Sequence, residues 1–134
     1  MSTHLITVKL DDSLEHVKSL FDGIKFHHLL VVENKKLKGV ISDRDLFKAV
    51  SPHVGTVSET DKDRASLRKK AHQIMTRKII SLPPEADFFE ALSIFVEKGV
   101  SCIPIINDEH KPLGIVSWRD LLRVLEARHN QNKK

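Results

Sequence analysis

The sequence predicts a mixed α+β fold made of two β-α-β-β-α repeats that pack together with pseudo-two-fold symmetry. Two observations predict this fold. Residues 39–48 return as residues 114–123 with the shared pattern Gly-h-h-Ser-x-Arg-Asp-Leu, in which h is hydrophobic and x is any residue. Each half also alternates short β-branched runs with amphipathic stretches in the same order, which indicates the same succession of strands and helices.

The repeat also sets the expected domain boundaries. The two copies lie 74 positions apart before the hairpin turn and 75 after it, because the second copy has one extra residue in that turn. We expect repeat 1 at residues 1–51, a loop and charged linker helix at 52–74, repeat 2 at 75–127 and a polar tail at 128–134. A repeat of about 50 residues buries too little surface to be stable alone, so the two are expected to pack on each other.

The elements of the first repeat follow from periodicity and capping residues. Residues 5–8 are typical of a strand, and Ser13 offers an N-cap to the helix that follows. Two hydrophobic runs, 29–32 and 37–41, flank a polar turn and predict an antiparallel hairpin, after which Ser42 begins a second helix. The first helix places these hydrophobic residues on one face: Leu14, Val17, Leu20, Phe21 and Ile24.

The second repeat shows the same order. We expect a strand at 79–82, a helix through Phe88 and Phe95, a hairpin at 102–106 and 113–116, and a last helix through Leu121 and Leu125. Between the repeats, the Pro, Gly and Ser residues of 52–60 indicate a loop. Residues 61–74 are expected to form one charged helix.

Composition narrows the class of protein. The chain has 40% hydrophobic and 30% charged residues, which is typical of a soluble globular protein. No apolar run approaches the length of a membrane span, so no membrane association is expected. The single Cys102 excludes an internal disulfide, and in its apolar strand it is interpreted as a packed thiol. These features predict a cytoplasmic protein.

Catalytic and metal sites are not expected. The sequence has eight histidines, but six are scattered, and the adjacent His27 and His28 point to opposite faces of a strand. It shows no nucleophile–base pair, Gly-rich phosphate loop or paired-His motif. We therefore expect no enzyme activity, no catalytic residue, no metal ligand and no required cofactor.

The Ser-x-x-Asp motif that follows a strand in each repeat has two interpretations, one structural and one as a ligand site. Ser42 with Asp45, and Ser117 with Asp120, fit the capping box that satisfies free N–H groups at the start of a helix. A strand-to-helix junction is also an anion site, and an Asp beside an Arg could hold a ribose and a phosphate. The two roles can coexist, with the Ser capping while the Asp reaches the sugar.

These residues carry a family resemblance. The tandem β-α-β-β-α units, the two Gly-h-h-Ser-x-x-Asp endings, the strand at 100–106 and the Ile74-Met75-Thr76 junction resemble a pair of CBS (cystathionine-β-synthase) domains, often called a Bateman module. The resemblance covers nearly the whole chain. It implies a non-catalytic regulatory sensor that binds AMP, ADP, ATP, S-adenosylmethionine or a related adenosyl ligand in clefts between the repeats.

The resemblance implies two composite sites. In each, the Ser and Asp after the third strand of one repeat hold the ribose, and the opening segment and second strand of the other repeat line the base pocket. The favoured site comprises Ser42, Arg44, Asp45, Thr76, Ile80, Val100 and Ser101. Its weaker twin comprises Thr3, Ile6, Phe26, His27, Ser117, Arg119 and Asp120.

The twin is expected to be weaker because its walls differ. Bulky Phe26 and His27 stand where the favoured site has Val100 and Ser101. Its opening segment also lies at the N-terminus, where fraying is expected. The family's proline in the second strand is present as Pro104 but is Leu30 in the first repeat. Trp118, which replaces Asp43 beside the second motif, is interpreted as a dimer contact.

Two alternatives stay open. The chain could be a ligand-free dimerisation or protein-interaction module in which Ser-x-x-Asp only caps helices. It could instead bind nucleic acid, which is disfavoured because the net charge is only +4. That alternative would use Arg64, Arg68, Lys69 and Lys70, for which a solvated helix face is the simpler interpretation. A homodimer is expected, and the regulated partner would be a separate, unknown protein.

Overall fold

Strands and helices follow the predicted order except for the strand expected at 79–82, and the fold is of the α+β class. The computed structural model describes residues 3–23 and 26–132. The chain divides into a first unit, Ile6–Ile79, and a second unit formed by Ile80–Lys134 together with residues before Ile6. The opening segment of the first repeat, described from residue 3, thus groups with the second unit, and most of the opening segment of the second repeat groups with the first.

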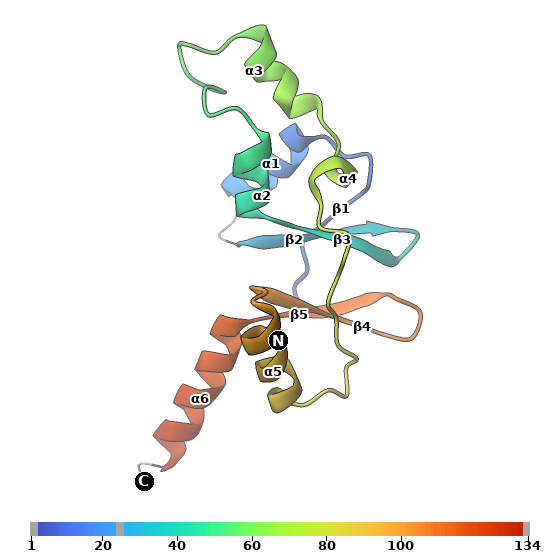
Figure 1. Cartoon of the computed structure of the whole chain (residues 1–134), viewed down its shortest axis with the longest axis vertical. Helices are drawn as coiled ribbons and strands as arrows, with labels where there is room; N and C mark the ends of the chain where they lie inside the picture. Colours follow the sequence, from blue (N-terminus) through green and yellow to red (C-terminus); the bar gives the residue numbers. More distant parts are fainter. Residues whose placement is uncertain (1–2, 24–25, 133–134) are drawn as a thin grey trace. The chain divides into compact units, whose positions relative to one another are not determined.

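The first unit contains a three-stranded sheet in the order β1-β2-β3 (Figure 1). β1 (Thr7–Val8) pairs in parallel with β2 (His28–Glu33), which pairs antiparallel with β3 (Lys36–Ser42). The helices α1 (Leu14–Gly23) and α2 (Asp43–Ala49) lie on one face of this sheet. Ser13 begins α1 as expected, because its Oγ accepts a hydrogen bond from the His16 N–H at 3.2 Å.

The core of the first unit lies between this sheet and its helices. Leu14 and Val17 of α1, Leu46 of α2 and Leu29 and Ile41 of the sheet are all buried. Each such side chain contributes about 1.5–3 kcal/mol to the free energy of unfolding. The other buried members of this cluster are Val8, Val31, Val50, Ala71 and Met75.

The predicted linker helix is broken into pieces. The segment forms α3 (Asp61–Ala65), a 3-10 turn η1 (Ser66–Arg68) and α4 (Ala71–Ile74) instead of one helix. The reason is tertiary: the Lys69 carbonyl accepts from the Leu14 N–H at 2.8 Å, and the Ala71 N–H donates to the Asp12 carbonyl at 2.8 Å. These bonds to the start of α1 hold Lys69 and Lys70 extended, so the expectation of a continuous helix was wrong.

The second unit repeats the hairpin and its two helices. β4 (Cys102–Ile106) pairs antiparallel with β5 (Pro112–Ser117), and α5 (Phe88–Lys98) and α6 (Trp118–Asn132) lie on one face of that hairpin (Figure 1). α5 is capped by Asp87 and ends at Gly99, whose φ of 65° is left-handed and suits glycine. Ala91, Ile103 and Leu121 are the buried centre of this unit.

One further expectation is corrected in the second unit, and the last helix is longer than expected. The segment 79–82 is not a strand; Leu82 alone makes a parallel bridge to Ile105. Pro83 and Pro84 follow directly and lack an N–H, so the pairing does not continue past Leu82. The last helix continues to Asn132, so most of the expected tail at 128–134 is helical. Arg128 supports this extension, since its guanidinium lies 5.2 Å from the centre of the Phe88 ring.

Candidate functional site

The first Ser-x-x-Asp junction forms a complete capping box at the start of α2. The Asp45 N–H donates to Ser42 Oγ at 3.1 Å, and the Ser42 N–H donates to Asp45 Oδ2 at 2.9 Å. Ser42 itself is extended, with φ −92° and ψ 163°, as an N-cap residue requires. The capping interpretation is therefore confirmed for this junction.

The capping box leaves part of Asp45 available. Its Oδ2 is used by the Ser42 N–H, whereas its Oδ1 makes no hydrogen bond or ion pair within the described chain. The residue is half-buried and fixed in direction by its cap. Arg44, one position earlier, is exposed. This junction therefore presents an oriented hydrogen-bond acceptor beside a solvent-exposed cation, which can serve a hydroxyl donor and an anion respectively.

The second junction is built alike but is more fully occupied. The Ser117 N–H donates to Asp120 Oδ2 at 2.8 Å, and the Asp120 N–H donates to Ser117 Oγ at 3.4 Å. Here the second oxygen, Oδ1, faces the guanidinium of Arg123 at 3.7 Å. Arg119 lies 5.7 Å from the centre of the Trp118 ring. The acceptor and the cation of this junction thus already have neighbours in their own helix.

The glycine that opens the first motif allows a close approach to the linker. A Cβ on Gly39 would lie 2.4 Å from Met75 Sδ and 3.0 Å from Met75 Cβ. Because Met75 can pack there, Thr76 reaches β3 and exchanges two backbone hydrogen bonds with Val40, at 2.9 and 3.1 Å. Thr76 therefore belongs to the same unit as Ser42, Arg44 and Asp45.

The other predicted residues divide between the units. Ile80, Val100 and Ser101 belong to the second unit, as do Thr3, Ser117, Arg119 and Asp120. Ile6, Phe26 and His27 belong to the first unit. Within it, Phe26 stacks on Phe21 with ring centres 4.7 Å apart, and His27 Nδ1 lies 3.0 Å from Asp43 Oδ2.

One pair of residues near the motifs was not predicted as functional. His28 pairs with Ser42 across β2 and β3, and Cys102 pairs with Ser117 at the equivalent place in the second hairpin. Burial lowers the pKa of His28, although Asp43 raises it; His27 lowers it further, Asp45 raises it and Arg44 lowers it. Burial also raises the pKa of the Cys102 thiol to about 12. Both residues are therefore kept neutral beside their serines, a feature that only the repeat spacing of 74 could have revealed.

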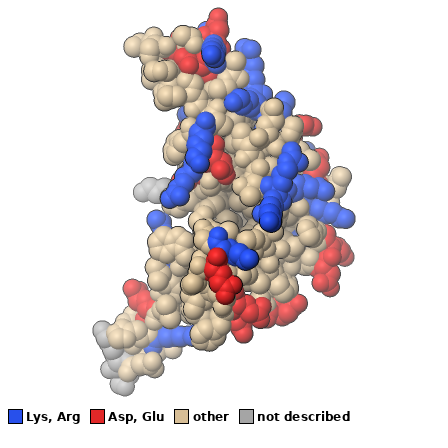
Figure 2. Space-filling view, in the orientation of Figure 1, with Lys and Arg blue, Asp and Glu red and all other residues tan. Residues whose placement is uncertain are grey.

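The described residues offer little support for a metal, membrane or nucleic-acid site. Among the described residues, no group of three or more His, Cys, Asp or Glu side chains could hold a metal ion. No helix in the described ranges is long and apolar enough to cross a membrane. Arg64, one of the four basic linker residues, is paired with Asp61 and lies 3.7 Å from Glu59 Oε2. Figure 2 shows that Lys and Arg side chains are interspersed with Asp and Glu on the visible face.

Comparison with known proteins settles the family. The model of the CBS domain matches residues 1–52 and 71–127, the two repeats. The chain belongs to the CBS-domain family. Its two repeats are a tandem CBS pair, as the resemblance implied.

Individual CBS proteins show the extent of the similarity. The uncharacterized protein MJ1225 of Methanocaldococcus jannaschii is 26% identical over 135 residues, which cover 96% of this chain and 48% of that protein. Its crystal structure, described as that of a candidate archaeal homolog of γ-AMPK, matches with a TM-score of 0.80 and 25% identity, again over 96% of this chain and 48% of that one. The inosine-5'-monophosphate dehydrogenase of the same organism is 30% identical over 89% of this chain and 21% of the enzyme. The chain thus spans half or less of these curated relatives.

A third CBS protein was solved with ligands. The CBS pair of MJ0100, in complex with 5'-methylthioadenosine and S-adenosyl-L-methionine, matches with a TM-score of 0.77 over 96% of this chain and 93% of that chain. Its sequence is 22% identical. This likeness supports the fold of the CBS pair.

Proposed function

We propose that this CBS pair is a non-catalytic, cytoplasmic regulatory module that binds an adenine nucleotide or another adenosyl compound. AMP, ADP, ATP and S-adenosylmethionine are the candidate ligands, and no further cofactor is required. The MJ0100 pair supports this class of ligand, because it was crystallised with two adenosyl compounds. The description of MJ1225 as a candidate homolog of γ-AMPK supports a regulatory role.

The carboxylate oxygen of Asp45 that has no partner among the described residues is the reason for placing the favoured site at this junction. Its capping box fixes the side chain, and Oδ1 stays available to accept from a ribose hydroxyl. Exposed Arg44 would face the ligand's phosphate or carboxylate. In the proposed favoured site these residues act with Ser42 and Thr76 of the first unit and with the following residues of the second unit: Ile80, Val100 and Ser101.

The twin site is proposed to bind more weakly. Arg123 lies close to the second oxygen of Asp120, and Trp118 lies beside Arg119, so a ligand must compete with both neighbours. Phe26 and His27 also contact Phe21 and Asp43 in their own unit, and would have to serve the ligand from those positions. Thr3, Ile6 and Ser117 complete the proposed twin.

Calorimetric titration with the four candidate ligands tests the proposal. We expect one of them to bind, and Asp45→Ala to weaken that binding by at least about tenfold, or about 1.4 kcal/mol. Asp87→Ala is the matched control, because Asp87 caps α5 through the Glu90 N–H at 2.9 Å and its loss costs a similar cap. Absence of binding by all four ligands, or equal weakening by both substitutions, would contradict the proposed site.

We further propose that the module acts as a homodimer and regulates a separate, unidentified protein. The helices of the second unit expose a set of large apolar side chains, which a monomer would leave in water. These are Phe89, Val96, Trp118, Leu122 and Leu125. Sedimentation at several concentrations tests this, and Leu122→Lys is expected to shift the protein towards monomer. A wild-type monomer at high concentration contradicts it.

A further inference from the structure

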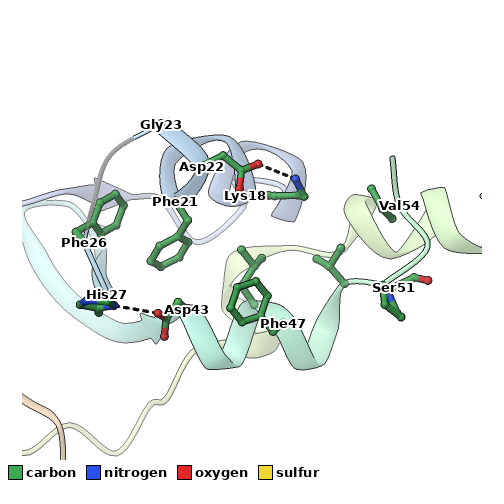
Figure 3. A pocket seen from close by; sticks show the side chains of 13 residues that line it. Lys18, Phe21, Asp22, Gly23, Phe26, His27, Asp43, Phe47, Ser51 and Val54 are labelled. Atoms are coloured by element: carbon green, nitrogen blue, oxygen red, sulfur yellow. Dashed lines mark hydrogen bonds and ion pairs between the residues drawn. The ribbon is translucent and has the colours of Figure 1, made fainter. Parts of the chain in front are cut away.

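The first unit contains a pocket on the helical side of its sheet, which we call the α1–α2 pocket. Its lining residues lie between positions 18 and 54 and come from α1, the segment just before β2, α2 and the loop after α2 (Figure 3). Its volume is about 760 Å³, within the range of about 300–1,000 Å³ that is usual for small-molecule sites. All of its walls belong to one unit, and none of them is a residue of the proposed favoured adenosyl site, although Phe26 and His27 are also assigned to the weaker twin.

The interior of the α1–α2 pocket is aromatic and aliphatic. Phe21 and Phe26 stack with an interplanar angle of 23°, and Leu46 and Val50 of α2 also line the pocket. Phe47, beside them, is 76% exposed. A ligand ring in the pocket would remove this apolar surface from water and gain offset or edge contacts with three phenyl rings.

Two carboxylates, Asp22 and Asp43, lie at the rim of the pocket. Asp22 Oδ2 lies 2.6 Å from Lys18 Nζ, and Asp43 Oδ2 lies 3.0 Å from His27 Nδ1. The Phe21 ring lies between these two pairs in Figure 3. Among the described lining residues, Lys18 is the one lysine or arginine, against the two carboxylates. An anionic ligand is disfavoured and a cationic one favoured.

Asp43 is the better placed of the two carboxylates. Its side chain is 33% exposed against 62% for Asp22, so its interactions are less screened by water. His27 occupies Oδ2, and Oδ1 has no hydrogen-bond partner among the described residues. An ammonium group at this position would gain a charge-assisted hydrogen bond and lie near the faces of the phenyl rings.

These features are particular to the first repeat. At the repeat's own spacing, the counterparts of Lys18 and Asp22 are Leu92 and Val96, and the counterpart of Asp43 is Trp118. The same fold is therefore built in the second repeat without the polar rim. The charged residues of the α1–α2 pocket are therefore not required to build a CBS repeat, and they are open to a role in recognition.

We propose that the α1–α2 pocket binds a small aromatic amine. The ring packs against Phe21, Phe26 and Phe47, and the ammonium group donates to Asp43. The pocket thereby gives the module a second ligand input, lined by residues other than those of the favoured adenosyl site. A second copy of the chain is the competing occupant, because Trp118 and Arg119 pair an aromatic ring with a cation. Arg119, however, already interacts with its own Trp118 and with other groups.

Protein-observed NMR titration of the full chain tests the proposal with three probes. Tryptamine carries both ring and ammonium, indole-3-acetate carries the ring with a carboxylate, and butylamine carries the ammonium without a ring. We expect tryptamine to bind and to shift signals of residues in α1 and α2. We expect the other two probes to bind weaker by about tenfold or more, since each lacks one of the two interactions.

Two substitutions locate the binding. Phe47→Ala and Asp43→Asn are each expected to weaken tryptamine binding by about tenfold. Val57→Ala is the control, since Val57 is fully exposed in the same unit, does not line the pocket and should leave the affinity unchanged. Phe47→Ala should also leave adenosyl binding unchanged, so a failure here is distinct from a failure of the adenosyl site.

Three outcomes overturn the proposal. If tryptamine does not bind, or binds no more tightly than indole-3-acetate, the pocket does not recognise an ammonium group. Tryptamine binding that survives both Phe47→Ala and Asp43→Asn places the ligand elsewhere. Failure of tryptamine combined with dissociation of a dimer by Phe47→Ala and by Trp118→Ala shows that a second copy fills the pocket.

Discussion

Asp45 and Asp120 occupy equivalent positions in the two CBS repeats, and each accepts a hydrogen bond from the backbone N–H of the serine three residues earlier, at 2.9 and 2.8 Å. They differ in the second oxygen, which is open in Asp45 and 3.7 Å from Arg123 in Asp120. The oxygen that accepts from the serine N–H stabilises the start of the helix in both repeats. The other oxygen depends on neighbours one helical turn away. A duplicated motif therefore does not offer the same free acceptor to a ligand in both repeats.

The largest expected effect concerns the glycine that opens the first motif. Gly39→Ala should destabilise the protein by about 1–3 kcal/mol, because the new Cβ would overlap the Met75 side chain and the core cannot expand freely. Gly23→Ala in α1 is the control, since its Cβ would meet nothing within 4 Å. Denaturant unfolding measures both. If the two variants unfold alike, the close approach of Met75 does not explain the motif glycine.

Asp45 and Asp120 should also differ in how much each contributes to ligand affinity. Asp120→Ala should weaken binding of the adenosyl ligand by less than about threefold, whereas Asp45→Ala should weaken it by about tenfold or more, equivalent to about 1.4 kcal/mol. Calorimetry on both variants under one set of conditions gives the ratio. Two stoichiometric sites that respond equally to the two substitutions would remove the asymmetry.

The caps themselves should differ slightly in strength. Ser42 Oγ accepts from the Asp45 N–H at 3.1 Å, while Ser117 Oγ is 3.4 Å from the Asp120 nitrogen. Ser42→Ala should therefore cost about 1 kcal/mol of stability, typical of an N-cap, and Ser117→Ala less. Urea unfolding midpoints of the ligand-free variants decide this. A larger loss for Ser117→Ala would show that distance does not rank these caps.

The smallest effect is a pH dependence carried by His28. Its pKa is lowered by burial, so below the ordinary value of 6.5 the unfolded chain takes up a proton that the folded chain refuses. Stability should then fall as the pH drops through 6.5 towards the folded pKa, and should not depend on His28 above that range. His28→Cys installs the residue found at this place in the second repeat and should reduce the loss of Tm between about pH 7.5 and pH 5.5.

A control separates His28 from the other histidines. His129 is exposed on α6, and His129→Gln should leave the change in Tm with pH as it is in the wild type. Equal changes in Tm for the wild type and His28→Cys would mean that acid acts elsewhere in the molecule.

Local signals in the sequence were sufficient for most elements. The stripe of Leu14 and Val17 predicted α1, and alternating hydrophobic runs predicted both hairpins. Ser42 and Asp45 predicted the helix start and its capping box, because a cap depends on residues only three positions apart. The repeat itself predicted the CBS pair, since the order of motifs is a property of the chain alone.

Contacts between distant segments decided the rest. Hydrogen bonds from Leu14 and Ala71 broke the linker helix, although its residues favour a continuous one. Met75 and Thr76 left their own repeat to pack on Gly39 and Val40, which no local periodicity shows. The sequence by itself determined that two Ser-x-x-Asp junctions exist. Only the tertiary structure decided which neighbours occupy their carboxylates, and where Phe21, Phe26 and Phe47 converge on a pocket, because both depend on side chains from separate elements.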